Sequence, residues 1–263
     1  MAKRPTIYIP TDPLFDVQWH LRNTGQVEGG IPGQDVNVIR VWPDYAGTGV
    51  KVAAMDDGFD QTHPDWGNNY LTEMAWDVVQ NTPGAQAGPD DDHGTAVGGL
   101  IVAAANNGIG GVGVAWDADL IAYRGLGDED AGDSTLVEGY FRDAATRMLA
   151  AGAHISSNSW GPMQTPFDDQ ADQPGYVDTA RQLASDGRDG LGIVTLFAAG
   201  NDRSVNLNAN YDPTDNMPYA IVVAASQADG LITSYSTPGA SVLVTAPGSD
   251  PSSMVTTDRQ GVL

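Results

Sequence analysis

The chain has 263 residues, of which 41% are hydrophobic, and this is enough for one large domain or two small ones with a substantial core. Its formal net charge of −22, from 34 acidic and 12 basic residues, argues against a nucleic-acid-binding protein, because the phosphate backbone requires Lys and Arg. The charge is compatible with Ca²⁺, cationic substrates or a salt-rich extracellular setting, although most of these carboxylates serve solubility. The sequence contains no cysteine and no apolar run long enough to span a membrane, so it predicts neither disulfides, nor thiolate chemistry, nor a membrane span.

The first third of the chain is mostly irregular. Residues 1–19 are predicted to form an extended arm, because their three prolines disfavour helix. A glycine-rich, loop-like stretch follows, with a short helical segment near residues 36–45. Residues 50–55 form a short apolar run, which is typical of a strand buried in a parallel sheet. Residues 59–92 are polar and irregular and end in an acidic run.

The rest of the chain alternates between predicted helices and strands. An uncharged segment that begins at His93 predicts a buried helix, because it is apolar on nearly every face. Residues 127–134 are acidic but lack the spacing of an EF-hand, so we interpret them as a solvated loop. Further helices are expected at 135–152 and 176–187, and further strands at 120–124, 154–162, 193–201, 220–226 and 241–247. This alternation predicts one α/β domain with a parallel sheet flanked by helices.

Polar side chains stand at three predicted element ends. Asp56 ends the first strand, His93 opens the buried helix, and Asn201 ends a later strand. The carboxyl ends of parallel strands are where open α/β sheets place their active sites, and a buried Asp can orient a histidine and stabilise its charged form. Each residue alone has a simpler structural interpretation, such as an Asx turn for Asp56. Together they favour a catalytic aspartate–histidine pair.

In this order, with Asp before His, the chain resembles the subtilisin-like serine proteases, whose triad runs Asp, His, Ser. The resemblance covers nearly the whole chain and is carried by residues 52–58, 93–99, 157–162, 198–201 and 235–249. The doubled Asp56-Asp57 and the stretches 12–21, 35–42 and 255–258 are similar to the kexin/furin branch of calcium-dependent processing proteases. The absence of cysteine suits a secreted bacterial member, whose leader peptide would not be visible in this sequence.

The resemblance implies a subtilisin-like three-layer fold, with a central, mostly parallel sheet flanked by helices and a C-terminal part that is missing from this chain. Residues 1–19 would be an N-terminal arm that docks on the body. Residues 20–263 would be an incomplete catalytic domain that lacks the serine-bearing segment.

The resemblance also implies roles for individual residues. Asp56 would orient His93, His93 would act as general base and then general acid, and Asn201 would donate its amide to the oxyanion. A peptide or protein substrate would lie as an added strand along the edge residues, which are Ser159, Trp160 and Gly161 on one side and Leu126 on the other. Three carboxylates would favour basic residues before the cut: Asp57 and Asp90 in the second subsite and Asp212 in the first.

The resemblance further implies a Ca²⁺ site, and its donor oxygens are the kind that Ca²⁺ prefers. The expected ligands are the side chains of Asp12, Asp65 and Asn107 and the carbonyl groups of Ala104, Ile109 and Gly111. This site would fasten the N-terminal arm to the body.

Three departures from the family pattern affect these expectations. Met163 and Gln164 stand where the branch has a second pocket aspartate, which Asp168 or Asp169 would replace only in a longer loop. Thr237 stands where the branch has a glutamate that helps hold a second calcium, so that ion is expected to be absent. No serine matches the nucleophile of the family's Gly-Thr-Ser motif, since Ser249, Ser252 and Ser253 lie too early.

Three explanations for the missing nucleophile remain open. The serine would lie on a second chain that stays bound after a nick, or the sequence is a truncated piece, or the scaffold does not catalyse. In the last case the chain is a calcium-stabilised peptide-binding module, a different class of function. By itself, the chain is expected to be unstable or prone to aggregation, because apolar surface would stay exposed.

Overall fold

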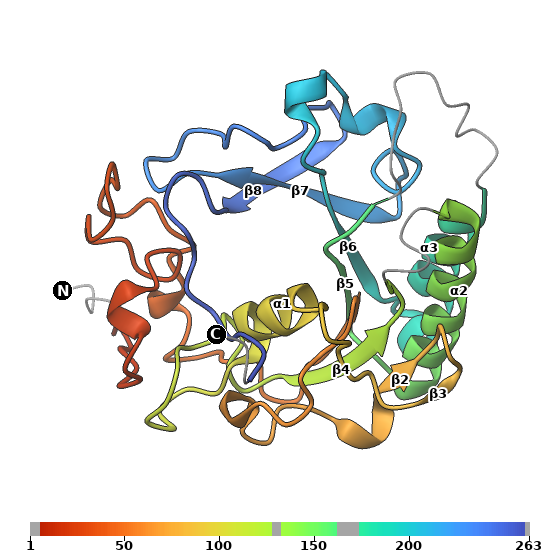
Figure 1. Ribbon diagram of the computed structural model, residues 1–263, viewed down its shortest axis with the longest axis horizontal. Helices are drawn as coiled ribbons and strands as arrows, with labels where there is room; N and C mark the ends of the chain where they lie inside the picture. The colour runs from red at the N-terminus through yellow and green to blue at the C-terminus, as the bar shows by residue number, and fades with distance from the viewer. Residues whose placement is uncertain (1–5, 128–132, 162–173, 261–263) are drawn as a thin grey trace.

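The computed structural model describes residues 6–127, 133–161 and 174–260, and an eight-stranded sheet organises them (Figure 1). The strand order is β3-β2-β4-β1-β5-β6-β7-β8, and every neighbouring pair is parallel except β2 and β3. The strands are β1 (Lys51–Asp56), β2 (Trp76–Asp77), β3 (Thr82–Pro83), β4 (Asp119–Arg124), β5 (Ile155–Asn158), β6 (Val194–Ala198), β7 (Ala220–Ser226) and β8 (Val242–Pro247). The predicted parallel α/β architecture is therefore confirmed.

Helices cover both faces of this sheet and give three layers (Figure 1). The α-helices are α1 (His93–Val102), α2 (Ser134–Ala151) and α3 (Pro174–Asp186). Short 3-10 helices occupy Phe15–Val17, Val38–Arg40, Pro64–Trp66, Thr72–Met74, Gly187–Gly190, Arg203–Val205 and Ala209–Tyr211. Among the described residues, no helix is both long and apolar enough to cross a membrane.

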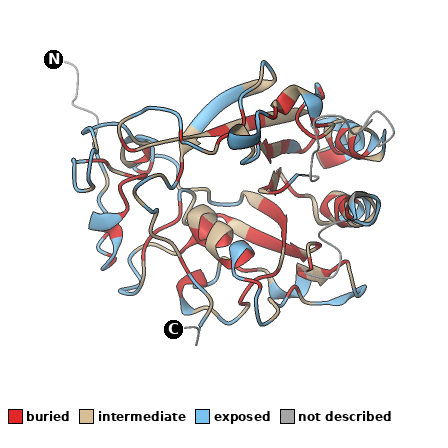
Figure 2. Ribbon diagram, turned by 45° about the horizontal axis from the view of Figure 1, so that its top comes forward, coloured by how far each residue is buried: buried red, intermediate tan, exposed pale blue. Residues whose placement is uncertain are grey.

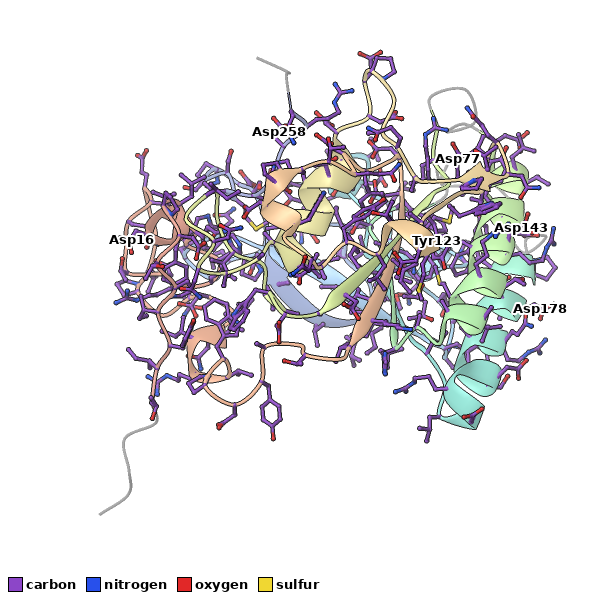
Figure 3. All side chains as sticks on the ribbon, turned by 90° about the horizontal axis from the view of Figure 1, so that it is seen from below. Asp16, Asp77, Tyr123, Asp143, Asp178 and Asp258 are labelled. Carbon is purple, nitrogen blue, oxygen red and sulfur yellow. The ribbon has the colours of Figure 1, made fainter. Side chains whose placement is uncertain are left out.

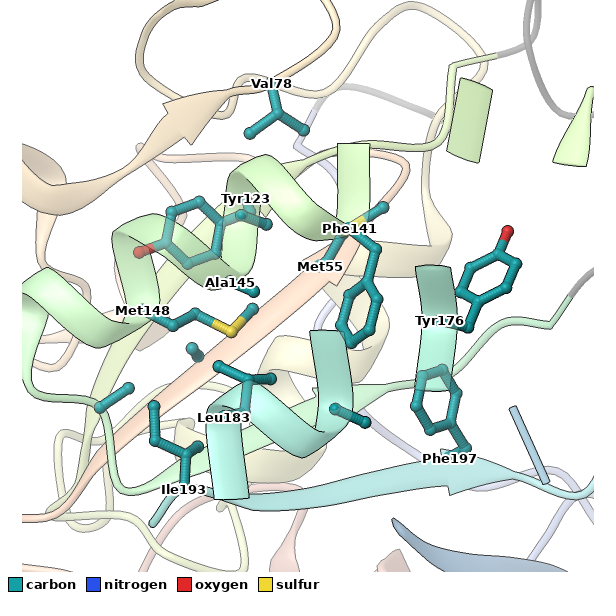
Figure 4. Packing of buried hydrophobic residues seen from close by; sticks show 14 of the residues in the cluster. Met55, Val78, Tyr123, Phe141, Ala145, Met148, Tyr176, Leu183, Ile193 and Phe197 are labelled. Atoms are coloured by element: carbon teal, nitrogen blue, oxygen red, sulfur yellow. The ribbon is translucent and has the colours of Figure 1, made fainter. Parts of the chain in front are cut away.

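The alternation of side chains along β1 explains why helices are needed on both faces. Ala53 and Met55 point into a core that α2 and α3 close, with Phe141 and Leu183 among its fully buried side chains (Figure 4). Val52 and Ala54 point to the other face, into a smaller core that includes Val102 of α1. Buried residues accordingly run along the central strands, while the outer sides of the helices are exposed (Figure 2). Because both sides of β1 are buried, its carboxyl end is held rigidly.

Some predicted elements differ in extent from those observed. The strand expected at 154–162 is β5, which ends at Asn158, and the strand expected at 193–201 is β6, which ends at Ala198. The helix expected near 36–45 is only a 3-10 turn, Val38–Arg40, because Pro43 cannot continue it. The irregular stretch 59–92 contains β2 and β3, which at two residues each are too short to show an alternating pattern. Most of the acidic loop 127–134 lies outside the described residues.

Helix α1 is less buried than its composition predicts. Four of its small residues, Gly94, Thr95, Gly98 and Gly99, are buried, whereas Leu100 and Ile101 are only half-buried. These two side chains line an open apolar groove of about 420 Å³ between α1 and the sheet. The other groove-lining residues are mostly apolar as well: His20, Val36, Val52, Val114, Ala115, Ile155, Ser157, Leu196, Ala246, Pro247 and Met254. An apolar face therefore remains uncovered by the described residues.

Both ends of the described chain pack against residues far away in the sequence. In the N-terminal arm, Phe15 and Trp19 are buried, and Tyr8 stacks on Trp116 with ring centroids 5.7 Å apart. At the other end, the hydroxyl groups of Thr256 and Thr257 donate to carbonyl groups of α1 at 2.8 and 2.6 Å. That residues 1–19 form an arm distinct from the body stays a prediction.

Candidate active site

The strand-end aspartate and the helix-opening histidine form a hydrogen-bonded pair. Asp56 is 1% exposed, and its Oδ1 lies 2.8 Å from Nδ1 of His93. Because a carboxylate accepts only, Nδ1–H donates, and Nε2 is left on a side chain that is 53% exposed. The hydrogen bond to Asp56 is the main cause that raises the pKa of His93, and burial opposes it. The pair can therefore take up a proton at Nε2 from a group that approaches from solvent.

Two glycines allow α1 to reach the end of β1. A Cβ atom at Gly94 would collide with the carbonyl oxygen of Gly58 and lie 3.0 Å from Cβ of Asp56. Gly58 itself has φ +148°, and a Cβ there would lie 2.5 Å from Cα of Ala87. Because these glycines lack a side chain, the backbone of α1 lies close to the backbone that follows β1. This brings His93 within hydrogen-bond distance of Asp56.

Asp57 holds the start of α1. Its two carboxylate oxygens accept from the backbone N–H groups of His93 at 3.1 Å and Gly94 at 2.7 Å. These are donors that the helix itself leaves without partners. Burial raises the pKa of Asp57 to about 6, although the bond from Gly94 opposes the rise. Asp57 is half-buried, so the structure adds a positioning role to the substrate-binding role that the sequence predicted.

An ion-pair network behind the site was not predicted from the sequence. Nη1 of Arg124 lies 3.2 Å from Oδ2 of Asp77, and its Nε lies 3.4 Å from Oδ2 of Asp91. The same oxygen of Asp91 accepts from the backbone of Gly88 at 2.8 Å. The network ties β4 and β2 to the turn that precedes His93. The only signal in the sequence was a basic residue at the end of an otherwise apolar strand.

The predicted substrate-edge residues lie at the carboxyl ends of β5 and β4. Ser159 is half-buried and Gly161 is exposed, whereas the indole of Trp160 packs edge-on against Phe197 in the main core, with centroids 5.2 Å apart. The ring of Trp160 is therefore part of the core, and only its backbone could contact a ligand at this edge. On the other side, Leu126 is half-buried and its N–H donates to the carbonyl of Asp56 at 3.2 Å.

Asn201 lies in a loop that Thr237 anchors. Asn201 is exposed and lines a hollow of about 290 Å³ together with Ser159 and Gly200, among other residues. The hydroxyl of Thr237 accepts from the N–H of Asp202 at 2.8 Å, and its N–H donates to the carbonyl of Gly200 at 3.0 Å. Thr237, which stands where the family pattern has a glutamate, thus holds the loop that carries Asn201.

The remaining predicted acidic residues differ in environment. Asp90 is exposed on the turn before α1. Asp212 is buried, and its Oδ1 accepts from the N–H and the hydroxyl of Thr214 at 2.7 and 2.6 Å. A Cβ built on Gly161 would lie 3.3 Å from Oδ2 of Asp212, so this carboxylate adjoins the predicted substrate edge. Met163, Gln164, Asp168 and Asp169 lie outside the described residues.

The predicted calcium ligands come together around two buried carboxylates. Asp12 accepts from the N–H groups of Asn106 and Asn107 at 2.6 and 3.1 Å. Asp65 accepts from Nδ2 of Asn107 at 2.7 Å and from the N–H of Gly111 at 3.2 Å. Burial raises the pKa of Asp65, and the charge of Asp12 adds to the rise.

The fit of this cluster to Ca²⁺ is partial. Ala104 donates its N–H to the carbonyl of Asp65 at 2.8 Å, and Asn107 and Gly111 donate to the carboxylate of Asp65. Asn107, however, directs its amide nitrogen to Asp65, while its oxygen accepts from the N–H of Ile109 at 2.9 Å. Rotation of that amide would turn an oxygen toward Asp65. Within the described ranges, no three His, Asp or Glu side chains converge, so two carboxylates are the charged part of this donor set.

No serine of the described residues hydrogen-bonds His93. Ser249 lies in a turn, where its N–H donates to the hydroxyl of Tyr235 at 3.1 Å. Its own hydroxyl accepts from the N–H of Met254 at 3.2 Å. The part of the chain that the structure describes thus contains an aspartate–histidine pair without a bonded nucleophile.

Comparison with known proteins identifies the family. Residues 47–262 match the model of the subtilase family, Peptidase_S8. Neuroendocrine convertase 2 of Homo sapiens is 34% identical over 237 residues, which are 85% of this chain and 35% of the relative. Furin of Bos taurus is 33% identical over 273 residues, which are 98% of this chain and 32% of the relative. The chain therefore spans about a third of the length of these curated relatives.

A solved structure agrees with this relationship. The serine protease of Aeromonas sobria superposes with a TM-score of 0.78 at 28% identity, over 94% of this chain and 45% of that protein. In its complex with a chaperone, the same protease gives a TM-score of 0.77 over 92% of this chain and 44% of that protein. The predicted subtilisin-like fold is confirmed.

Proposed function

This chain belongs to the subtilase family, and we propose that it carries the aspartate and histidine of a calcium-dependent serine endopeptidase that cuts proteins or peptides after basic residues. The observation that carries the proposal is the 2.8 Å hydrogen bond between the buried carboxylate of Asp56 and Nδ1 of His93. We further propose that the protein is a secreted bacterial protease, a setting that its strongly acidic, cysteine-free sequence suits.

The pair supplies the acid–base chemistry of peptide hydrolysis. Nε2 of His93 takes the proton from a serine hydroxyl as that oxygen attacks the scissile carbonyl. Asp56 accepts from Nδ1–H throughout and stabilises the imidazolium that results. His93 then gives the proton to the departing amine, and the same steps with water release the acyl group. Asn201 donates its side-chain amide to the oxyanion, a contribution of about 3 kcal/mol in sites of this kind.

The serine, in this proposal, comes from a polypeptide segment that is not part of this sequence. The uncovered apolar groove beside α1 supports this, because a segment that brings a hydroxyl to Nε2 of His93 would also bury Leu100 and Ile101. Apolar surface of this kind marks a binding site for another polypeptide. In this proposal the serine-bearing segment is either a second chain that stays bound or a continuation of this chain.

The substrate would lie as an extended strand between residues 159–161 and Leu126. Backbone groups at both edges would pair with the substrate backbone and supply affinity without reading its sequence. Asp57 and Asp90 would contribute negative charge on one side of the site and Asp212 on the other. This arrangement suits Arg or Lys before the scissile bond.

Calcium would serve as a structural ion in this proposal. Asp12, Asp65 and Asn107, with the carbonyl groups of Ala104, Ile109 and Gly111, would hold it. When bound, the ion neutralises two buried carboxylates that otherwise repel each other and links the arm to the loop at 104–111. It takes no part in proton transfer.

Mass spectrometry of the native protein tests the proposal. The protein is purified from its source, labelled with a serine-directed fluorophosphonate and analysed intact under denaturing conditions. We expect label on a segment outside residues 1–263, with no label after Asp56→Asn or His93→Ala substitution. Asp178→Asn is the matched control, since Asp178 is 61% exposed on the outer side of α3 (Figure 3).

Two outcomes contradict the proposal. Label on a serine within residues 1–263 would place the nucleophile where the structure shows none beside His93. A protein that carries no label, yet binds peptides with basic residues, would be the peptide-binding module.

A further inference from the structure

We propose that Asp215 supplies the second carboxylate of the subsite that receives the basic side chain before the scissile bond, where it acts as a pair with Asp212. This inference rests on the proposed function and names a specificity-determining residue that family resemblance does not indicate.

Asp215 is a buried carboxylate that is not fully satisfied. The residue is 3% exposed, and its Oδ1 has no hydrogen-bond partner. A buried charge or polar atom without a partner is costly, so such groups in folded proteins point to a ligand or a functional role. By contrast, Oδ1 of Asp212 is occupied by Thr214, which donates to it from its N–H and its hydroxyl.

A tight turn holds the two carboxylates together. The N–H groups of Asp215 and Asn216 donate to the carbonyl of Asp212 at 3.2 and 2.8 Å. The negative charge of Asp212 also acts on the carboxyl group of Asp215. The 212–216 turn therefore fixes the backbone positions of the two residues relative to each other.

The pair adjoins the predicted path of the substrate. Oδ2 of Asp212 lies 3.3 Å from the position that a Cβ on Gly161 would take. Gly161 follows Ser159 and Trp160, the edge along which the substrate backbone would run. A long cationic side chain that passes Gly161 would meet Asp212 first and Asp215 next to it.

A bound cationic side chain can replace the proton that Asp215 carries. Burial raises the pKa of Asp215 to about 8, and the charge of Asp212 adds to the rise. At pH 7 the carboxyl group of Asp215 is therefore mostly protonated. Burial also raises the pKa of the nearby Tyr176, and the charges of Glu138 and Asp212 add to the rise, so its hydroxyl is neutral at this pH. A guanidinium or ammonium group would displace the proton and pair with both carboxylates, whereas a neutral side chain would leave them unpaired.

A side-chain cation fits this place better than a divalent metal. Among the described residues, no third His, Asp or Glu joins the pair to complete a metal-binding group.

Cleavage of matched peptides tests the proposal on the protease with its serine-bearing segment in place. The peptides differ only before the cut, with Arg, Lys or norleucine. Asp215→Asn should lower the kcat/KM ratio of Arg over norleucine at least tenfold, mainly through KM. Asp143→Asn, which removes the same charge from an exposed position on α2 (Figure 3), should leave the ratio unchanged.

The possible failures are distinguishable. If the wild-type protein cuts the norleucine peptide as well as the Arg peptide, the preference for basic residues in the proposed function is wrong. If it prefers Arg and Asp215→Asn keeps the ratio, only the assignment of Asp215 is overturned.

If Asp215→Asn does not fold, a measurement on the wild-type protein tests the proposal instead. Peptide aldehydes that end in argininal or norleucinal are titrated calorimetrically at pH 7 in two buffers of different ionisation enthalpy. The argininal peptide should release close to one proton more than the norleucinal peptide. Equal proton release overturns the proposal, and so does competition between Ca²⁺ and the argininal peptide, which would assign the pair to a metal.

Discussion

Nε of Arg124, at the end of β4, lies 3.4 Å from Oδ2 of Asp91, on the turn that leads into His93. Arg124 also contacts Asp77 of β2 at 3.2 Å, so one guanidinium joins two strands to the start of the catalytic helix. All three side chains are at most 15% exposed. The position of His93 therefore depends on a buried charge network as well as on its bond to Asp56.

Removal of the Arg124 charge should destabilise the protein strongly. Arg124→Gln leaves Asp77 and Asp91 buried without their cation, and we expect a loss of about 3–5 kcal/mol of unfolding free energy. The measurement is urea denaturation followed by fluorescence. Arg181→Gln is the control, because that pair with Asp178 is exposed and should contribute at most about 1 kcal/mol. Equal effects of the two substitutions would contradict the prediction.

The pH dependence of His93 should follow its bond to Asp56. That bond raises the pKa of His93, and the neutral imidazole is the active base, so the acid limb of kcat/KM should lie above pH 6.5. Asp56→Asn should lower the pKa and reduce kcat by about 10⁴-fold, because the histidine loses its orienting acceptor. NMR titration of the imidazole nitrogens reads the pKa without catalysis. An unchanged pKa in Asp56→Asn would show that the bond has no such effect.

Asn201 should act on the transition state and not on substrate binding. Asn201→Ala is expected to lower kcat by about 10²–10³-fold with little change in KM, since the oxyanion exists only as the bond is cut. Asn206→Ala is the control, as an exposed asparagine nearby on the same connection. A change confined to KM would place Asn201 in substrate binding instead.

Calcium should stabilise the fold through Asp65. In Ca²⁺ at about 100 times its dissociation constant, unfolding should cost about 2.7 kcal/mol more than in EDTA. Asp65→Asn should abolish this difference, whereas Asp178→Asn should keep it. Differential scanning calorimetry with and without Ca²⁺ makes the comparison. A melting temperature that EDTA leaves unchanged in the wild-type protein would exclude the site.

Asp215 should make stability depend on pH. Its pKa rises from the usual value near 3.8 to about 8 in the folded protein, so the folded state binds the proton more tightly than the unfolded state. This contribution is complete below about pH 4 and is lost as the pH rises through about 8. Unfolding free energy should therefore fall across this range, and less steeply in Asp215→Asn. Asp143→Asn should keep the wild-type slope, and the same slope in Asp215→Asn would show that Asp215 is not the titrating group.

The sequence by itself determined the architecture and the central pair. The buried strand at 50–55, the apolar segment after His93 and the alternation beyond it depend on local patterns that survive in the fold. Asp56 and His93 could be placed together because parallel strands and their helices bring their ends to one edge of the sheet.

Only the tertiary structure decided how the other charged residues are used. Arg124, Asp91 and Asp215 are unremarkable in the sequence, because their roles depend on burial and on partners many residues away. For Asp57 the sequence indicated only a substrate contact, and the structure adds its hydrogen bonds to the N–H groups of His93 and Gly94. The composition of α1 likewise did not predict its half-buried face, because an apolar segment does not show which of its sides other elements will cover.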